Sequence, residues 1–210
     1  MVRFRVTLIV VSLVLLFLGY QDAGQTLRNP EPLSIELSTL LREGAPREWL
    51  HVTGGYQNLD AAISTSGQAE RFTALLIPLV TDPDENLFQV LVETRDPGLL
   101  DLLYRYHFGF DNVFAQERFR EEQSQAFRAP REVTGMVVTG TIAESNRSKL
   151  LELAQATGLN VAENVIFISE GKTPAQYRGF FFLAMGLAGL VKGILMFRAP
   201  GTKPQAPRHP

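Results

Sequence analysis

The sequence predicts an α+β protein in which a small, β-rich and barrel-like domain lies between two transmembrane helices. Three observations support this class. An uncharged apolar segment occupies Val6–Tyr20, and a second one with a single charge occupies Gly179–Phe197. Between them, residues 21–178 combine short β-branched runs with helix-capping residues. The whole chain has 45% hydrophobic and 20% charged residues, close to globular averages, so the middle segment can form a compact core.

The first apolar segment, residues 4–20, has two interpretations. A helix of about 20 apolar residues crosses a bilayer, and the lower limit is about 17. A cleaved signal peptide has the same basic start and apolar run, followed by small residues at the cleavage site. Here "QDAGQT" follows, and no small-x-small pair precedes a suitable cleavage position. We favour an uncleaved anchor and keep the signal peptide as the alternative.

The second apolar segment, residues 179–197, contains several small residues and one lysine. Gly186, Gly189 and Gly193 fall on roughly one helical face, and the last two form a GxxxG pair. Such residues let membrane helices approach closely, so we predict that this face packs against the first helix or another protein. The alternative is that glycine is simply common in membrane helices. Lys192 is near the helix end, where its long stem can reach the headgroups.

The charge distribution predicts the orientation of the two spans. All 22 acidic residues lie between Asp22 and Glu170, whereas the ends carry only basic charge: Arg3, Arg5, Lys192, Arg198, Lys203 and Arg208. Short basic flanks remain cytoplasmic. We therefore expect both termini in the cytoplasm, the domain at 21–178 outside, and a disordered, proline-rich cytoplasmic tail at 198–210.

The first half of the domain contains one predicted helix and three predicted strands. The segment "PLSIELSTLLREG" predicts a short helix with Ser34 as its N-cap and Gly44 beyond its end. A strand is expected at Trp49–Thr53, stopped by Gly54 and Gly55. The runs "RFTALLIPLV" and "LFQVLVET", joined by "TDPDEN", predict a β-hairpin.

The second half begins with Asp96 and Pro97, which are typical of an N-cap and the first position of a helix. A strand is predicted in "REVTGMVVTGTI", and a helix capped by Ser145 should end at Gly158. A last strand is expected in "ENVIFISEG". Five or so short strands with few helices predict a small curled barrel, similar to an oligonucleotide/oligosaccharide-binding (OB) fold. A plain α+β sandwich is the alternative.

Several kinds of chemistry are excluded or disfavoured by the sequence. The absence of cysteine excludes disulfides, thiolate catalysis, zinc–thiolate sites and iron–sulfur clusters, and it suits an exported bacterial inner-membrane protein. Asp82, Asp84 and Asn86 have the spacing of a calcium loop, but Leu87 replaces the required glycine, so we predict a hairpin turn. The three histidines, His51, His107 and His209, are far apart in sequence. We predict no metal, cofactor or catalytic residues.

An unusual aromatic stretch, "YRYHFGF", supplies the candidate interaction residues. Tyr104, Tyr106, Phe108 and Phe110 alternate with other residues, and on a strand they would line one face. That face could bind a ligand by stacking or lie at a bilayer surface. The alternative, which we favour, is a core face or a helix end running into a loop.

The segments "HVTGGYQNLDAAIS", "LLIPLVTDPDENLFQVLVETRDPG" and "EVTGMVVTGTI" occur in an order that resembles the surfeit-locus assembly proteins of cytochrome oxidase. The resemblance covers about half of the chain. It implies a barrel-like domain between two terminal helices and a role in assembly. The family's Asn-Arg-Gly-Trp stretch corresponds here to Thr94–Pro97, where only Arg95 matches, so the resemblance implies no site residue.

These observations predict a membrane-anchored, non-catalytic interaction or assembly protein. Its expected partners are the lipid bilayer and another membrane or extracytoplasmic protein. Nucleic acid is disfavoured, because the acidic domain would repel phosphates. The alternative is a membrane-tethered extracytoplasmic hydrolase with a Ser/His/Asp set, although the chain has no GxSxG motif.

Overall fold

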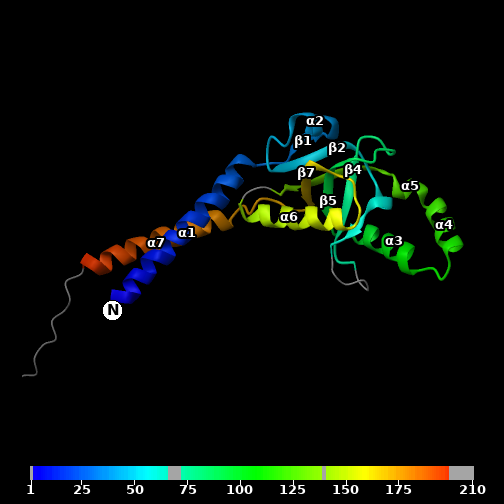
Figure 1. Ribbon diagram of the computed structural model, residues 1–210. Helices are drawn as coiled ribbons and strands as arrows, with labels where there is room; N and C mark the ends of the chain where they lie inside the picture. The colour runs from blue at the N-terminus through cyan, green and yellow to red at the C-terminus, as the bar shows by residue number, and fades with distance from the viewer. Residues whose placement is uncertain (1, 66–71, 139–140, 199–210) are drawn as a thin grey trace, which may run out of the picture. The chain divides into compact units, whose positions relative to one another are not determined.

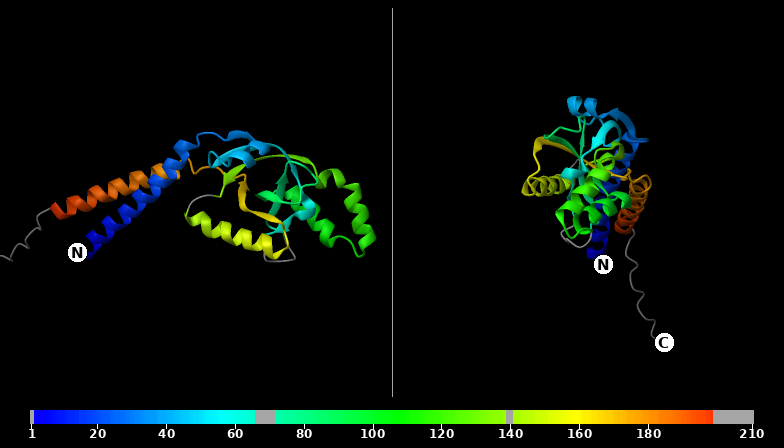
Figure 2. Two further views of the ribbon diagram at one scale, coloured as in Figure 1. Left: turned by 45° about the horizontal axis from the view of Figure 1, so that its top comes forward. Right: turned by 90° about the vertical axis from the view of Figure 1, so that its right-hand side faces the viewer.

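The computed structural model describes residues 2–65, 72–138 and 141–198 (Figures 1 and 2). It forms two compact units: the domain Asn29–Thr173 and a pair of terminal helices. The predicted tail and His209 lie outside the described residues, apart from Arg198, which ends the last helix. The elements in chain order are α1 Val2–Arg28, β1 Leu33–Glu36, α2 Leu37–Glu43, β2 Trp49–Gln57, a 3₁₀ turn Leu59–Ala61, β3 Ile63–Ser64, β4 Leu75–Val80, β5 Phe88–Thr94, α3 Pro97–Phe108, α4 Val113–Glu122, α5 Ser124–Phe127, β6 Pro130–Val137, α6 Thr141–Ala156, β7 Val161–Glu170 and α7 Arg178–Arg198.

The domain is built on a closed β-barrel. The strand order is β1-β2-β6-β7-β5-β4-β3, and β2 also pairs with β4. Strands β2, β6, β7, β5 and β4 therefore form a five-stranded ring, with β1 and β3 added outside it. Within the ring, β5 and β7 are parallel and the other neighbours are antiparallel. The coarse prediction of an α+β, barrel-like domain is confirmed.

Strand β2 closes the ring, and here the sequence-based prediction was wrong. Gly54 and Gly55 do not stop the strand. Instead, the register with β6 shifts between Val52 and Gly55, and Gly54 has a φ of 72°, which glycine adopts without strain. The strand then continues to Tyr56 and Gln57, which pair with β4. After the bulge, β2 still pairs with β6 through Gly55 and Tyr56, and its last two residues also pair with β4 on the other side.

The hairpin of β4 and β5 is confirmed, with "TDPDEN" as its connection. The turn holds itself together, since the Asp84 N–H donates to Asp82 Oδ1 at 3.0 Å. The hairpin residues Leu76, Ile77, Leu79, Val90 and Val92 are all buried, and Val90 and Val92 share one cluster.

Two predicted helix starts were wrong. Ser34 lies in β1, so α2 begins only at Leu37 and has no side-chain N-cap bond. Its end is as predicted, because Gly44 follows with a φ of 78°. Helix α6 begins at Thr141, so Ser145 lies inside the helix rather than at its cap. Gly158, with a φ of 79°, follows its end.

The barrel core has three parts. The first takes residues from all five ring strands, together with Leu37 and Leu40 of α2, so it fills the barrel interior. The second includes Ala154 of α6 with residues of β4, β5 and β7. The third joins Leu75 and Ile77 of β4 to α3 and α5. Strand β4 is therefore covered on both faces, which explains why all six of its residues are buried.

The two terminal helices lie side by side and run antiparallel (Figure 1). At one end the Arg178 guanidinium donates to the Asp22 carboxylate at 2.7 Å. At the other end the Arg5 guanidinium lies 5.5 Å from the centre of the Phe197 ring. Within the described residues, Arg3–Arg28 and Arg178–Phe197 are long and apolar enough to cross a membrane.

Candidate interaction surface and arginine groove

Three helices between β5 and β6 form an arm on one side of the barrel (Figure 1). Helix α3 starts as the sequence predicted: Asp96 Oδ1 accepts from the Gly98 N–H at 2.8 Å, and Pro97 occupies the first position. Helix α4 is capped by Asn112, whose Oδ1 accepts from the Ala115 N–H at 2.8 Å. Local capping thus defines both helices.

Tyr104, Tyr106 and Phe108 lie at the end of α3, and Phe110 lies just after it. The favoured interpretation, a helix end running into a loop, therefore applies, and the strand interpretation was wrong. Because a helix turns by about 100° per residue, Tyr104 and Phe108 share a face and Tyr106 points elsewhere. Tyr104 is 42% and Phe108 is 51% exposed. Their ring centres are 5.3 Å apart, and Phe72 packs against both.

The other two aromatic residues fix the arm in place. Tyr106 packs edge-on against Phe127, with ring centres 5.2 Å apart, and Phe127 is buried in the third part of the core. Phe110 lies beyond α3 and packs against Phe119 of α4 at 5.1 Å. The four predicted residues are therefore divided: Tyr104 and Phe108 face outward, while Tyr106 and Phe110 hold the arm together.

Two exposed apolar residues were missed by the sequence analysis. Val113 and Phe114 begin α4, and they are 64% and 82% exposed. None of the described residues of α4 is buried, so this helix has no apolar face turned to the core. An apolar pair at the start of an otherwise charged helix was the available signal. We use "arm face" for the exposed residues Tyr104, Phe108, Val113 and Phe114.

Ion pairs attach the arm to the barrel. Arg120 of α4 donates from Nε and Nη2 to the two oxygens of Asp60, both at 2.8 Å. Arg128, after α5, donates to Asp60 Oδ2 from Nη2 at 3.2 Å. Partial burial raises the pKa of Asp60, but the hydrogen bonds and charges of the two arginines outweigh this effect, so the pKa is lowered overall. Asp60 is therefore ionised at neutral pH.

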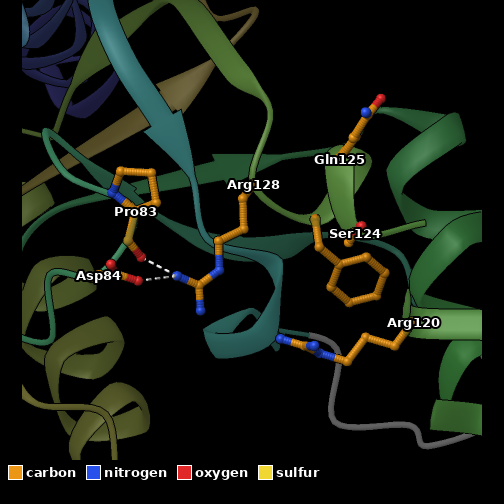
Figure 3. Close-up of a pocket in the computed structure, with 7 residues that line it drawn as sticks. Pro83, Asp84, Arg120, Ser124, Gln125 and Arg128 are labelled. Carbon is orange, nitrogen blue, oxygen red and sulfur yellow. Dashed lines mark hydrogen bonds and ion pairs between the residues drawn. The ribbon is translucent and has the colours of Figure 1, made fainter. Parts of the chain in front are cut away.

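These arginines border an open groove of about 360 Å³ between the β4–β5 turn and the arm (Figure 3). Its lining residues are Pro83, Asp84, Arg120, Ser124, Gln125, Phe127 and Arg128. Across the groove, Arg128 Nη1 donates to the backbone oxygen of Pro83 and, at 3.3 Å, to Asp84 Oδ1. The Asp84 side chain is 96% exposed, so this last contact is open to water.

A second polar cluster is more enclosed. Arg131 of β6 donates to both oxygens of Glu170, at 2.9 and 2.8 Å, and to Gln57 Oε1 at 3.2 Å. Gln57 in turn donates to the backbone oxygen of Ala126 at 2.6 Å. Arg131 Nε is buried without a hydrogen-bond partner in the described part of the chain. This network links the ring strands to the arm.

Two hydroxyl–base contacts bear on hydrolytic chemistry. His51 Nδ1 lies 2.7 Å from Thr134 Oγ1, but Thr134 is an exposed cross-strand neighbour on β6. Lys172 Nζ donates to Ser169 Oγ at 3.3 Å. The Ser169 hydroxyl is buried and donates to Glu93, so it is directed away from solvent. Neither contact presents an activated nucleophile to a substrate.

No metal-binding group was found: within residues 2–65, 72–138 and 141–198, no three His, Asp or Glu side chains cluster suitably.

The predicted glycines of α7 lie against α1. A Cβ atom added at Gly186 would lie 2.8 Å from Leu16 Cγ, one at Gly189 would meet Ser12 Oγ, and one at Gly193 would lie 2.8 Å from Ile9 Cγ1. Lys192 is exposed, although the adjacent Gly193 is buried. Gly19 and Gly179, which the sequence analysis did not select, make equally close contacts between the helices.

No known family description, curated protein or solved structure matches this chain.

Proposed function

We propose that this chain is a membrane-anchored, non-catalytic interaction or assembly protein that binds a protein partner through the arm face. The observation that carries this proposal is the exposure of large apolar side chains on the arm, with Phe114 82% exposed. Exposed apolar groups rimmed by polar residues mark interaction sites, and aromatic residues are enriched in protein interfaces. The arm is fixed to the barrel by packing and ion pairs, so it presents these side chains without a large ordering cost.

The membrane location is part of the proposal. The two apolar helices would supply two spans, and their antiparallel packing brings Arg5 and Phe197 to the same end of the helix pair. The basic flanks favour the cytoplasm for that end. Reporter fusions test this placement: a fusion at Gln68 should give an exported signal and a fusion to the tail a cytoplasmic one. The reverse pattern would contradict the topology.

We also propose that the barrel is OB-like. The support is its ring of five short strands with non-sequential neighbours, in which β5 lies beside β7 and β2 beside β6. The assembly role rests in addition on the resemblance to the surfeit-locus family. Arg95, the one residue that matches that family's motif, is exposed and donates to Glu93 at 3.2 Å, so it adds no site residue to the proposal.

Site-specific photo-crosslinking in membranes tests the function. A photoreactive residue at position 108 or 114 of the full chain should give the same protein adduct. The matched control is a photoreactive residue at Leu87, which lies just before β5 and is 45% exposed. It should not give this adduct. The substitution Phe114→Ser should remove the adduct formed at 108 while the chain remains folded, since Phe114 makes few contacts that folding depends on. Equal adducts at positions 87 and 114 would refute a specific arm face.

A further inference from the structure

We propose that the arginine groove binds a carboxylate group, and that Asp84 occupies the ligand's place in the free protein. This inference does not depend on the arm face. It rests on three features of the groove: two arginines that share the single carboxylate of Asp60, unused hydrogen-bond donors, and a weakly held carboxylate at the groove's edge.

The charge balance favours a single anionic group. Asp60, Arg120 and Arg128 form one connected set in which two guanidiniums share one carboxylate, and the exposed Asp84, paired with Arg128, balances the second positive charge in the free protein. Asp60 has both oxygens engaged by this set, so it holds the two arginines at a fixed spacing. A monoanionic carboxylate that displaced Asp84 from Arg128 would supply the same single negative charge, whereas a phosphate dianion would exceed it.

The donors that remain are suited to a carboxylate. A guanidinium has five N–H groups arranged to meet planar oxygen pairs. Within the described residues, Arg120 uses only Nε and Nη2, both on Asp60, so its Nη1 remains available. Figure 3 shows the Arg120 and Arg128 side chains extending toward one another along the groove. Their guanidiniums are thus held at the wall of an open space of about 360 Å³.

Asp84 already places one carboxylate against the arginines of the groove. Its carboxylate approaches Arg128 Nη1 at 3.3 Å, yet 96% of the side chain is exposed. An exposed pair of this kind is weak and screened, so an incoming carboxylate can displace it. Arg128 would keep its bonds to Asp60 and to the Pro83 backbone, so the groove need not rearrange.

The test uses the full chain in an uncharged detergent and a blocked penta-glutamate peptide carrying an uncharged dye. Fluorescence anisotropy should show saturable binding of this peptide and none of the penta-glutamine control. Asp84→Asn should tighten binding about two- to fivefold, because it removes a competitor held by an exposed ion pair. Asp101→Asn is the matched control: it removes the same charge from an exposed position on α3 and should leave affinity unchanged.

A second variant tests the contribution of the groove's arginines to peptide binding. The double substitution of Asp60→Asn with Arg120→Gln removes both partners of this partly exposed ion pair together, so neither of the two charges is left without its partner. It should lower affinity at least about tenfold, the usual effect of losing a charged hydrogen bond. If sodium acetate displaces the labelled peptide, a free carboxylic acid is enough to occupy the groove. If only unlabelled penta-glutamate displaces it, the site is assigned to acidic peptides.

Three results would overturn the proposal. One is absence of binding by both penta-glutamate and acetate to the Asp84→Asn variant. Another is equal tightening by Asp84→Asn and Asp101→Asn, which would indicate general electrostatics. The third is competition by inorganic phosphate that is tenfold stronger than competition by acetate.

Discussion

The contacts between α1 and α7 predict that Gly186 is harder to replace than Gly189, although the two glycines looked alike in the sequence. A methyl group added at Gly186 would lie 2.9 Å from the backbone oxygen of Ser12. One added at Gly189 would meet Ser12 Oγ but stay 3.5 Å from Ser12 Cβ. A hydroxyl can rotate away, whereas a backbone oxygen moves only with its helix. Gly186→Ala should therefore separate the helices and Gly189→Ala should not.

The magnitudes follow from these distances. Ordinary contact begins at 3.4 Å, so the helices must part by about 0.5 Å at Gly186. Forcing an extra methyl into a packed interface costs about 1–3 kcal/mol. At Gly189 the expected loss is only the hydrogen bond from Ser12 Oγ to the Leu8 oxygen at 2.7 Å, about 0.6 kcal/mol in a membrane. Because alanine favours a helix by about 1 kcal/mol over glycine, Gly189→Ala should be nearly neutral.

Cross-linking measures the association of the two helices. The chain lacks cysteine, so Asp22→Cys with Arg178→Cys introduces one pair where the ion pair now joins the helices. A bifunctional thiol reagent should link them, and the mole fraction of sodium dodecyl sulfate that halves the yield reports stability. Gly186→Ala should lower that midpoint, and Gly189→Ala should leave it unchanged. If both variants lower it equally, the distinction between backbone and side-chain contacts is wrong.

Three further predictions concern the barrel, its acid stability and the lysine of α7. Leu76→Ala should lower the free energy of unfolding by about 2–5 kcal/mol, and Val90→Ala should also lower the melting temperature, since both residues are fully buried. Leu87→Ala, at an exposed position, is the control, and an unchanged melting temperature in both core variants would contradict the barrel core. Because the pKa of Asp60 is lowered in the folded protein, its ionised carboxylate stabilises the fold above the unfolded pKa of about 3.9, and this stabilisation is lost as the pH falls through the lower folded pKa. Asp60→Asn should therefore make the stability depend less on pH below about pH 4, which acid unfolding followed by circular dichroism can measure. Lys192→Arg should preserve the protease accessibility of both termini in membranes, because the exposed arginine can also reach the headgroups; loss of function with intact topology would instead identify Lys192 as a functional group.

Much of the barrel could be predicted because its strands are locally encoded. The β4–β5 hairpin joins two β-branched runs through a turn rich in aspartate and proline, and each feature acts within a few residues. Closure of the ring could not be predicted in the same way. Gly54 and Gly55 are typical of a strand end, yet here they form a bulge that depends on pairing with both β6 and β4.

The arm illustrates a conflict between two local signals. The alternation from Tyr104 to Phe110 favoured a strand, whereas Asp96 and Pro97 favoured a helix. The helix forms because it buries Leu99 and Leu103, four residues apart, against the barrel. The groove was beyond sequence reasoning, since its arginines are 60 and 68 residues from Asp60 and meet it only through the fold.

The helix pair bears on the two interpretations of the first apolar segment, anchor or signal peptide, and this leads to a last prediction. Helix α1 continues without a break to Arg28, past the region where a signal peptide would be cut. Its buried residues Ser12 and Gly19 are seven apart, as are Gly179, Gly186 and Gly193 on α7, and a seven-residue repeat lets two helices keep one seam in contact.

Cleavage near Tyr20 would remove most of this seam and leave the glycines of α7 facing lipid. We therefore expect the purified protein to retain residues 2–28. Intact-mass measurement of the chain from membranes should show the uncleaved N-terminus, and adding Gly186→Ala should not change the mass beyond that of one methylene group. A mature N-terminus anywhere after Tyr20 would show that α7 packs against something other than α1.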